Sequence, residues 1–229
     1  MEAVILAGGK GTRLSEVISD VPKPMAPVND KPFLFYLFQW LKKYPVEKVI
    51  LSIGYKSESI IKYFGNSFSG IPIEYVIEEK PLGTGGAVSY ALQKTTGTDI
   101  LILNGDTYFT IDLNKFFSFH TENGHLFSVA LKHMQNFTRY GSVECNKDTI
   151  LNFREKMFCS DGLINGGIYL INRKYFETKQ IAGAFSLETE ILEKEAGTAK
   201  IKGLVFDDSF IDIGIPEDYH LAQSLLKFK

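Results

Sequence analysis

Residues 2–14 read EAVILAGGKGTRL. The apolar run Ala3–Leu6 ends in glycines and predicts a short buried strand. Glycines fill three of the four positions 8–11, so backbone N–H groups can wrap around a polyanion, and Lys10 and Arg13 add positive charge. The loop lacks the Gly-Lys-Ser/Thr of a Walker loop and the third glycine of the dinucleotide fingerprint. Taken alone, it fits either a phosphate-binding loop or a flexible turn from a strand to a helix.

Beyond this loop, apolar runs alternate with helical patterns through the first hundred residues. We expect strands at 48–53, 73–77 and 100–103, and helices at 33–44, 57–64 and 84–94. Buried strands that alternate with helices predict a parallel sheet covered by helices on both faces.

After Asp106 the pattern changes to strands with fewer helices between them. We expect strands at 127–131, 142–145, 150–153 and 167–171, and a last helix that Pro216 opens. This predicts an α/β sheet, mostly parallel at its centre, with antiparallel additions in the second half. No repeat, low-complexity tract or linker divides residues 1–229, so we expect a single domain.

Composition excludes several classes of protein. The formal net charge is −2, which argues against a nucleic-acid binder that works through a strongly basic surface. Two cysteines, Cys145 and Cys159, cannot build a disulfide framework or a four-ligand zinc site. The first residues do not read as a signal peptide, and no apolar run approaches the roughly 20 residues that cross a bilayer. We therefore expect a cytoplasmic protein that contacts neither nucleic acid nor membrane.

Three further positions suggest chemistry. Prolines on both sides hold Lys23 in an extended backbone, within VPKPM at 21–25, although such a lysine is more often part of a surface turn. Asp106 follows a buried strand at its carboxyl end, where parallel sheets bind ligands. Asp212 follows the apolar pair Phe210–Ile211. Read singly, the two aspartates could also be a turn residue and a helix cap.

The glycine loop and the proline-flanked lysine together resemble the sugar-1-phosphate nucleotidylyltransferases. Five further segments agree: PLGTGGA at 81–87, NGD at 104–106, FREK at 153–156, NGGIY at 165–169 and DIGIPEDY at 212–219. The resemblance covers nearly the whole chain and implies a Rossmann-like nucleotidyltransferase fold. It also implies a nucleotide-binding part at about residues 1–110 and a sugar-phosphate-binding part at about residues 111–229.

The family joins a sugar 1-phosphate to a nucleoside triphosphate. A phosphate oxygen of the sugar attacks the α-phosphorus in line, and pyrophosphate leaves. Such a reaction needs a phosphate cradle, cations, and carboxylates that hold Mg²⁺. The family's motifs imply Asp106 and Asp212 for the metal, Arg13 and Lys23 for the triphosphate, and Lys156 for the sugar phosphate.

The same resemblance implies the remaining site residues. The nucleotide-binding candidates are Leu6, Ala7, Gly8, Gly9, Lys10, Gly11, Thr12, Arg13, Lys23, Glu78, Gly83, Thr84, Asn104 and Asp106. The sugar-phosphate candidates are Gly141, Glu155, Lys156, Asn165, Gly167 and Glu188. Glu188 also reads as the start of an ordinary helix with Ser186 as its cap.

Glu78 bears on the choice of base. The family commonly places a glutamine here, five residues before the glycine of Leu-Gly-Thr, to read uracil or thymine. A carboxylate only accepts hydrogen bonds, and guanine offers two adjacent donors, whereas uracil offers one donor between two acceptors. Glu78 therefore favours GTP, as in the mannose-1-phosphate guanylyltransferases.

Within the family, the chain most resembles the bacterial D-glycero-α-D-manno-heptose 1-phosphate guanylyltransferases, which make GDP-heptose for capsule, S-layer or lipopolysaccharide glycans. The expected partners are GTP and the sugar 1-phosphate, and the chain is either a monomer or a homodimer. The alternatives are mannose 1-phosphate with GTP, or N-acetylmuramate 1-phosphate with UTP. A catalytically silent nucleotide-sugar sensor is a different class, which loss of Lys23, Asp106 or Asp212 would favour; all three are present.

Overall fold

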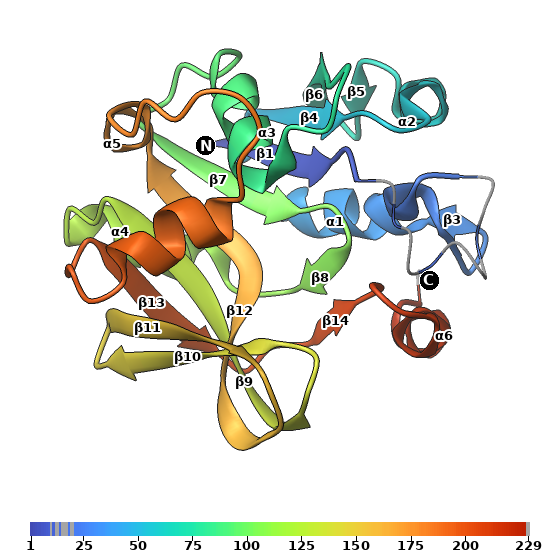
Figure 1. The fold of residues 1–229 in the computed structure, drawn as a ribbon. Coiled ribbons are helices and arrows are strands. Elements are labelled where there is room, and N and C mark those ends of the chain that lie inside the picture. The colour runs from blue at the N-terminus through green and yellow to red at the C-terminus, as the bar shows by residue number, and fades with distance from the viewer. Residues whose placement is uncertain (10, 12–13, 15–17, 19–20, 228–229) are drawn as a thin grey trace.

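A computed structural model describes residues 1–9, 11, 14, 18 and 21–227 of the chain (Figure 1). Its main sheet has ten strands in the order β10-β11-β13-β9-β12-β7-β1-β4-β6-β5. Their bounds are β1 Glu2–Ala7, β4 Lys48–Ile53, β5 Ser67–Phe68, β6 Ile71–Ile77, β7 Asp99–Asn104, β9 Phe127–Phe137, β10 Gly141–Asn146, β11 Thr149–Lys156, β12 Cys159–Asn172 and β13 Ile201–Phe206.

The first half of the chain forms the parallel part of this sheet. Strands β6, β4, β1 and β7 lie side by side and run in the same direction. Helices α1 (Phe33–Leu41) and α2 (Ser57–Phe64) bury their apolar side chains with Ala3 and Ile5 of β1, whereas α3 (Gly83–Leu92) packs with Val4 on the opposite face. Alternate residues of one strand therefore face different helices, as expected for a buried parallel strand. The predicted fold class is confirmed.

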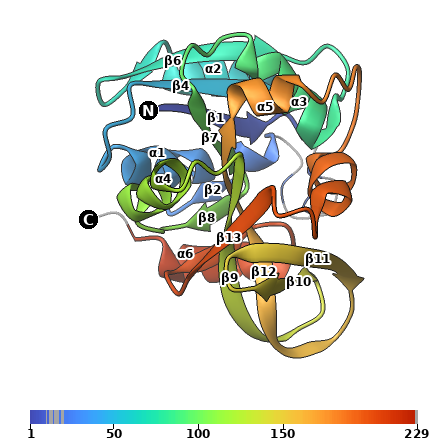
Figure 2. The same cartoon turned by 90° about the vertical axis from the view of Figure 1, so that its left-hand side faces the viewer.

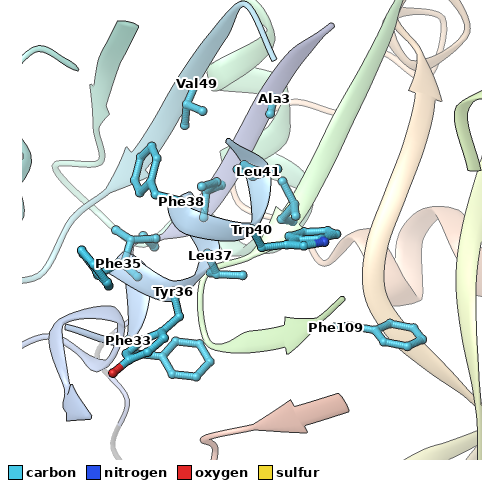
Figure 3. Close-up of a cluster of buried hydrophobic side chains, with 14 of the residues drawn as sticks. Ala3, Phe33, Phe35, Tyr36, Leu37, Phe38, Trp40, Leu41, Val49 and Phe109 are labelled. Atoms are coloured by element: carbon cyan, nitrogen blue, oxygen red, sulfur yellow. The ribbon is translucent and has the colours of Figure 1, made fainter. Parts of the chain in front are cut away.

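Helix α1 is the most buried helix of this half. Eight of its nine residues are buried, and Figure 3 shows Phe38 packed toward Val49 while Trp40 leaves the helix on the opposite side. Burying each large side chain contributes about 1.5–3 kcal/mol. The helix stops at Leu41, before the expected end at residue 44, because the last turn tightens: the Lys43 N–H donates to the Trp40 carbonyl (3.1 Å) and the Tyr44 N–H to the Leu41 carbonyl (3.0 Å), each three residues back instead of four.

The second half adds antiparallel strands beside β7. Strand β12 pairs antiparallel with both β7 and β9, and β13 joins β9 in parallel. Figure 2 shows β9–β12 curling away from the parallel strands at the other end of the molecule. A register shift between Asn165 and Tyr169 marks a bulge in β12, and beyond it β12 pairs with β9 on one edge and with β7 on the other. The helical elements here are α4 Leu113–Glu122, α5 Arg173–Glu177, the π-helix η3 Glu188–Glu193 and α6 Pro216–Leu225.

Several short elements lie outside the ten-stranded sheet. The 3₁₀ turn η2 (Lys23–Met25) leads into the hairpin β2 (Pro27–Val28) and β3 (Lys31–Pro32). Strand β8 (Thr107–Phe109) pairs antiparallel with β14 (Phe210–Asp212) in a separate two-stranded ribbon. In the described part of the chain, no helix is long and apolar enough to span a membrane.

The turn of the β2–β3 hairpin holds the C-terminal end of α6. Asn29 Nδ2 donates to the carbonyls of Gln223 (2.8 Å) and Leu226 (2.7 Å), and the Asn29 N–H donates to Gln223 Oε1 (2.9 Å). The Tyr219 hydroxyl donates to the Pro27 carbonyl at 2.5 Å. These bonds fix the segment after Lys23 to the helix that follows Asp212.

We predict that Asn29→Gly lowers the thermal stability. Asn29 has φ +45°, which glycine adopts without strain, so this change chiefly removes the two side-chain bonds. Their loss should cost about 1–3 kcal/mol, or roughly 2–4 °C in Tm per kcal/mol. Thermal melting measures this, with Asn114→Ala, an exposed residue of α4, as the control. An unchanged Tm for Asn29→Gly would mean that the hairpin does not hold α6.

Candidate active site

A cavity of about 390 Å³ opens at the carboxyl ends of β1 and β7. Most of the predicted nucleotide-binding residues line it: Leu6, Ala7, Gly8, Gly9, Gly11, Lys23, Glu78, Gly83, Thr84, Asn104 and Asp106. The other lining residues, which the sequence reasoning missed, are Pro24, Pro81, Ala87 and Gly214. The predicted Lys10, Thr12 and Arg13 lie outside the described residues. The structure thus brings residues from five separate motifs to one cavity.

Lys23 lies between two carboxylates. Its Nζ is 2.5 Å from Asp106 Oδ2 and 3.6 Å from Asp212 Oδ1, and its side chain is only 11% exposed. Asp106 belongs to the turn after β7, and Asp212 ends β14. The ribbon explains how residues so distant in sequence meet, because Asp212 pairs with Thr107, the neighbour of Asp106. The Ile213 N–H also donates to the Asp106 carbonyl at 3.0 Å.

Two glycines of the first loop allow side chains to approach its backbone closely. Gly11 has φ +64°, and a Cβ there would lie 2.8 Å from Cβ of Lys23. A Cβ at Gly8 would lie 2.5 Å from Glu78 Oε1. Larger residues would displace Lys23 and Glu78 from the cavity wall.

The donor set suits a divalent cation. Asp212 Oδ1 is buried and has no hydrogen-bond partner among the described residues. Burial, and then the negative charge of Asp106, raise the pKa of Asp212, while Lys23 opposes this rise. The described residues contain no cluster of three or more His, Cys, Asp or Glu ligands. Two carboxylates with phosphate oxygens and water are nevertheless a sufficient ligand set for a hard divalent ion.

Glu78 faces the cavity with its carboxylate fixed at both oxygens. The Ser52 hydroxyl donates to Oε1 at 2.9 Å, and the Leu82 N–H donates to Oε2 at 3.1 Å. Each carboxylate oxygen can accept a second hydrogen bond. Glu78 therefore keeps two acceptor sites for a ligand in the cavity, in a fixed orientation.

Three of the predicted sugar-phosphate residues lie close to this cavity: a Cβ at Gly167 would lie only 2.8 Å from Nδ2 of Asn104, which lines it. Asn165 Oδ1 accepts from the Gly167 N–H and Asn165 Nδ2 donates to the Tyr169 hydroxyl, both at 2.9 Å. Glu188 Oε2 accepts from the hydroxyls of Thr84 (2.6 Å) and Ser186 (2.8 Å). Since Thr84 lines the cavity, the Glu188 carboxylate lies at its margin.

Glu188 also begins the π-helix η3, and the Thr189 N–H donates to Ser186 Oγ at 3.2 Å. The helix start with Ser186 as its cap is therefore present, although the helix is a π-helix and not an ordinary one, and the role of Glu188 toward a sugar stays a prediction. π-Helical segments are rare and are frequently found at functional sites.

The remaining three predicted residues lie outside the cavity. Gly141 pairs with Lys156 across β10 and β11. Glu155 and Lys156 are exposed near the end of β11, and neither lines the cavity. The structure therefore brings the nucleotide motifs and the two aspartates together, whereas Glu155 and Lys156 lie on β11, outside the cavity.

Sequence reasoning missed a group of residues beside Asp212. Arg139 Nη2 donates to the Tyr140 hydroxyl at 2.7 Å and forms an ion pair with Asp218. Burial and the charge of Asp106 raise the pKa of Asp212, and the charge of Arg139 opposes this rise, as that of Lys23 does. Burial, followed by the charge of Asp212, raises the pKa of Tyr140 to about 12. The only signal in the sequence is position: Arg139 and Tyr140 precede Gly141, and Asp218 lies in the last motif.

Comparisons with known proteins agree with this geometry. Residues 2–227 match the nucleotidyl transferase family. The chain is 49% identical to a D-glycero-α-D-manno-heptose 1-phosphate guanylyltransferase from Aneurinibacillus thermoaerophilus, over 99% of both chains. It is 48% identical to the enzyme of the same name from Campylobacter jejuni, over 96% of this chain and 97% of that one. The crystal structure of HddC from Yersinia pseudotuberculosis complexed with GMP-PN superposes with a TM-score of 0.86, at 35% identity and 99% coverage of both chains.

We predict that Asp212→Asn stabilises the metal-free protein. Because the folded pKa of Asp212 is raised, its ionised form destabilises the fold above that pKa, and the effect disappears as the pH falls toward 3.8. At pH 7.5 in a chelator, the Tm of the variant should be a few degrees higher, at roughly 2–4 °C per kcal/mol. The gain should shrink toward pH 4.

Thermal melting at several pH values tests this, with the exposed Asp208→Asn as the control. A divalent cation should raise the Tm of the wild type more than that of Asp212→Asn. A lower Tm for Asp212→Asn at pH 7.5 would contradict the electrostatic description of the pair.

Proposed function

The chain belongs to the nucleotidyl transferase family, and from this premise we propose that it transfers GMP from GTP to D-glycero-α-D-manno-heptose 1-phosphate. The products are GDP-heptose and pyrophosphate. The chain is thus a nucleotidyltransferase, and the names of the relatives that are 48–49% identical support the choice of substrates. The observation that carries the proposal is the Lys23 ammonium held between Asp106 and Asp212 at the nucleotide-sized cavity.

Catalysis by these residues consists of positioning and charge neutralisation. The backbone N–H groups of the glycine loop receive the triphosphate, and Lys23 donates to its oxygens as a point charge. Members of the family generally use a divalent metal ion. Here we propose Mg²⁺ held by Asp106 and Asp212, which would neutralise charge on the α-phosphate. An oxygen of the sugar phosphate then attacks in line, and no covalent enzyme intermediate is needed.

The base and the sugar are assigned to different parts of the chain. The two free acceptor sites of Glu78 match the N1–H and 2-amino donors of guanine. We assign Asn165, Gly167 and Glu188 to the sugar hydroxyls, and their nearness to the cavity residues Asn104 and Thr84 supports this assignment. We assign residues 1–110 to the nucleotide and residues 111–229 to the sugar phosphate, within one domain. GTP and sugar phosphates are cytoplasmic metabolites, so we propose the cytoplasm as the site of action and surface glycans as the destination of the product.

Pyrophosphate release with Mg²⁺ tests the proposal. The four nucleoside triphosphates are combined with heptose, mannose and N-acetylmuramate 1-phosphates. The highest kcat/KM should belong to GTP with D-glycero-α-D-manno-heptose 1-phosphate. Preference for another pair would overturn the proposed substrates, whereas nucleotide-sugar binding without any pyrophosphate release would indicate a silent sensor.

We predict that Glu78→Gln reduces the preference for GTP over UTP and dTTP. A glutamine amide offers one acceptor and one donor, so one guanine donor loses its partner. An unpaired buried group costs about 1–3 kcal/mol, which is roughly 10- to 100-fold in kcat/KM. The measurement compares the three triphosphates for the wild type, Glu78→Gln and the exposed control Glu79→Gln. If Glu78→Gln keeps the wild-type ratio, another residue reads the base.

We predict that Lys156→Ala raises KM for the sugar phosphate more than KM for GTP. Lys156 is exposed on β11 and is free to meet the phosphate of an incoming sugar. Loss of a charge-assisted bond of about 1.5–3 kcal/mol weakens binding roughly 10- to 100-fold. Separate titrations of the two substrates measure this, with the exposed Lys174→Ala in α5 as the control. A raised KM for GTP alone would reverse the role given to Lys156.

A further inference from the structure

A second cavity, of about 440 Å³, lies behind the β8–β14 ribbon. Its walls come from α1, β8, β14 and the end of α6 (Figure 1). Its lining residues include the aromatic residues Tyr36, Trp40, Tyr44 and Tyr108 and the lysines Lys43 and Lys227. None of them lines the nucleotide cavity, which at about 390 Å³ is the smaller of the two. The second cavity therefore has room for a ligand the size of a nucleotide.

Fixed aromatic rings form much of the wall. The Tyr36 hydroxyl donates to the Val28 carbonyl at 2.8 Å, and the Tyr44 hydroxyl donates to the Ile111 carbonyl at 3.0 Å. Trp40 packs edge-on against Tyr44, with ring centroids 5.9 Å apart. Rings held in this way keep flat apolar surfaces in place, on which a planar ligand can stack.

Trp40 provides a polar group that the fold leaves unused. Its side chain is 2% exposed, and Nε1 is buried without a hydrogen-bond acceptor among the described residues. Buried indole N–H groups usually find a partner. In Figure 3 the indole extends from α1 away from Phe38 and Val49. Since Trp40 also lines the second cavity, a ligand acceptor there is the natural partner for this donor.

The charge of the cavity indicates the sign of the ligand. Lys43 and Lys227 are exposed at its rim, and Thr110 and Ser209 supply hydroxyls. No aspartate or glutamate is found among its described lining residues, although the chain as a whole has a net charge of −2. A local excess of positive charge on a slightly acidic protein favours an anion.

The ribbon separates this cavity from the proposed reaction centre. Tyr108 pairs with Ile211, and both residues line the second cavity, whereas the adjacent pair, Thr107 and Asp212, leads to the Lys23 cluster. A ligand in the second cavity would lie behind the two carboxylates and leave the substrate pocket free.

We propose that the cavity behind the ribbon is a second binding site, for an anionic ligand with a flat ring, of the nucleotide class. The ring packs against the aromatic wall that Tyr44 and Tyr108 form, an acceptor on the ligand takes the Trp40 N–H, and phosphate lies at Lys43 and Lys227. The site is independent of which sugar the substrate pocket takes.

Equilibrium dialysis with GDP, in Mg²⁺ and without sugar phosphate, tests the proposal. The wild type should bind two GDP per chain. Lys43→Glu combined with Lys227→Glu should bind one and keep the wild-type turnover, because neither residue lines the substrate pocket. The control, Lys42→Glu combined with Lys62→Glu, changes two exposed lysines outside the cavity and should still bind two.

Trp40 is the only tryptophan of the chain, so its fluorescence reports the second site directly. GDP should change this fluorescence in the wild type, and the Kd from the titration should be at least tenfold higher in Lys43→Glu/Lys227→Glu. Guanosine, which lacks phosphate, should bind the site more weakly than GDP. Trp40→Phe keeps a ring and removes the N–H, so dialysis should find its second site weakened several-fold. One GDP per wild-type chain, or two in Lys43→Glu/Lys227→Glu, would overturn the proposal, whatever the outcome of the pyrophosphate assay.

Discussion

The ion cluster of Lys23 with Asp106 and Asp212 is the interaction on which the proposed site depends. Each residue arrives by a different route: a proline-flanked turn, the end of a buried parallel strand, and a ribbon from the end of the chain. Two carboxylates this close repel each other, so the ammonium between them is needed when no cation is bound. The Ile213–Asp106 backbone bond and the Asn29 contacts to α6 hold the three segments in position relative to one another.

The parallel half of the fold was predictable because each of its elements carries a local pattern. The strand at Lys48–Ile53 and the helix at Ser57–Phe64 have the expected bounds, since Gly54 and Gly65 end them. The helix α4 and the strand β13 were not predicted. Helix α4 had a local signal, the Asp112 cap that accepts from two backbone N–H groups, whereas β13 owes its place to pairing with β9, a distant segment.

The residues of the candidate site were likewise predictable only in part. Motifs identified the residues of the first cavity, because a glycine loop and strand ends show their chemistry in a few consecutive residues. Arg139 escaped notice because its importance comes from Asp212 and Asp218, more than seventy residues later. The Lys156 motif was found, but its distance from the cavity follows from the pairing of β11 with β10, which no local pattern fixes.

The central claim is that the cluster performs the transfer and does not merely hold the fold together. The most direct test is Asp106→Ala, with kcat and thermal melting measured on the same preparation. Removal of one electrostatic stabiliser of a transition state costs about 10²–10³ in rate. We therefore expect kcat to fall at least that far while the Tm stays close to the wild-type value. Near-normal turnover by a well-folded Asp106→Ala would contradict this account.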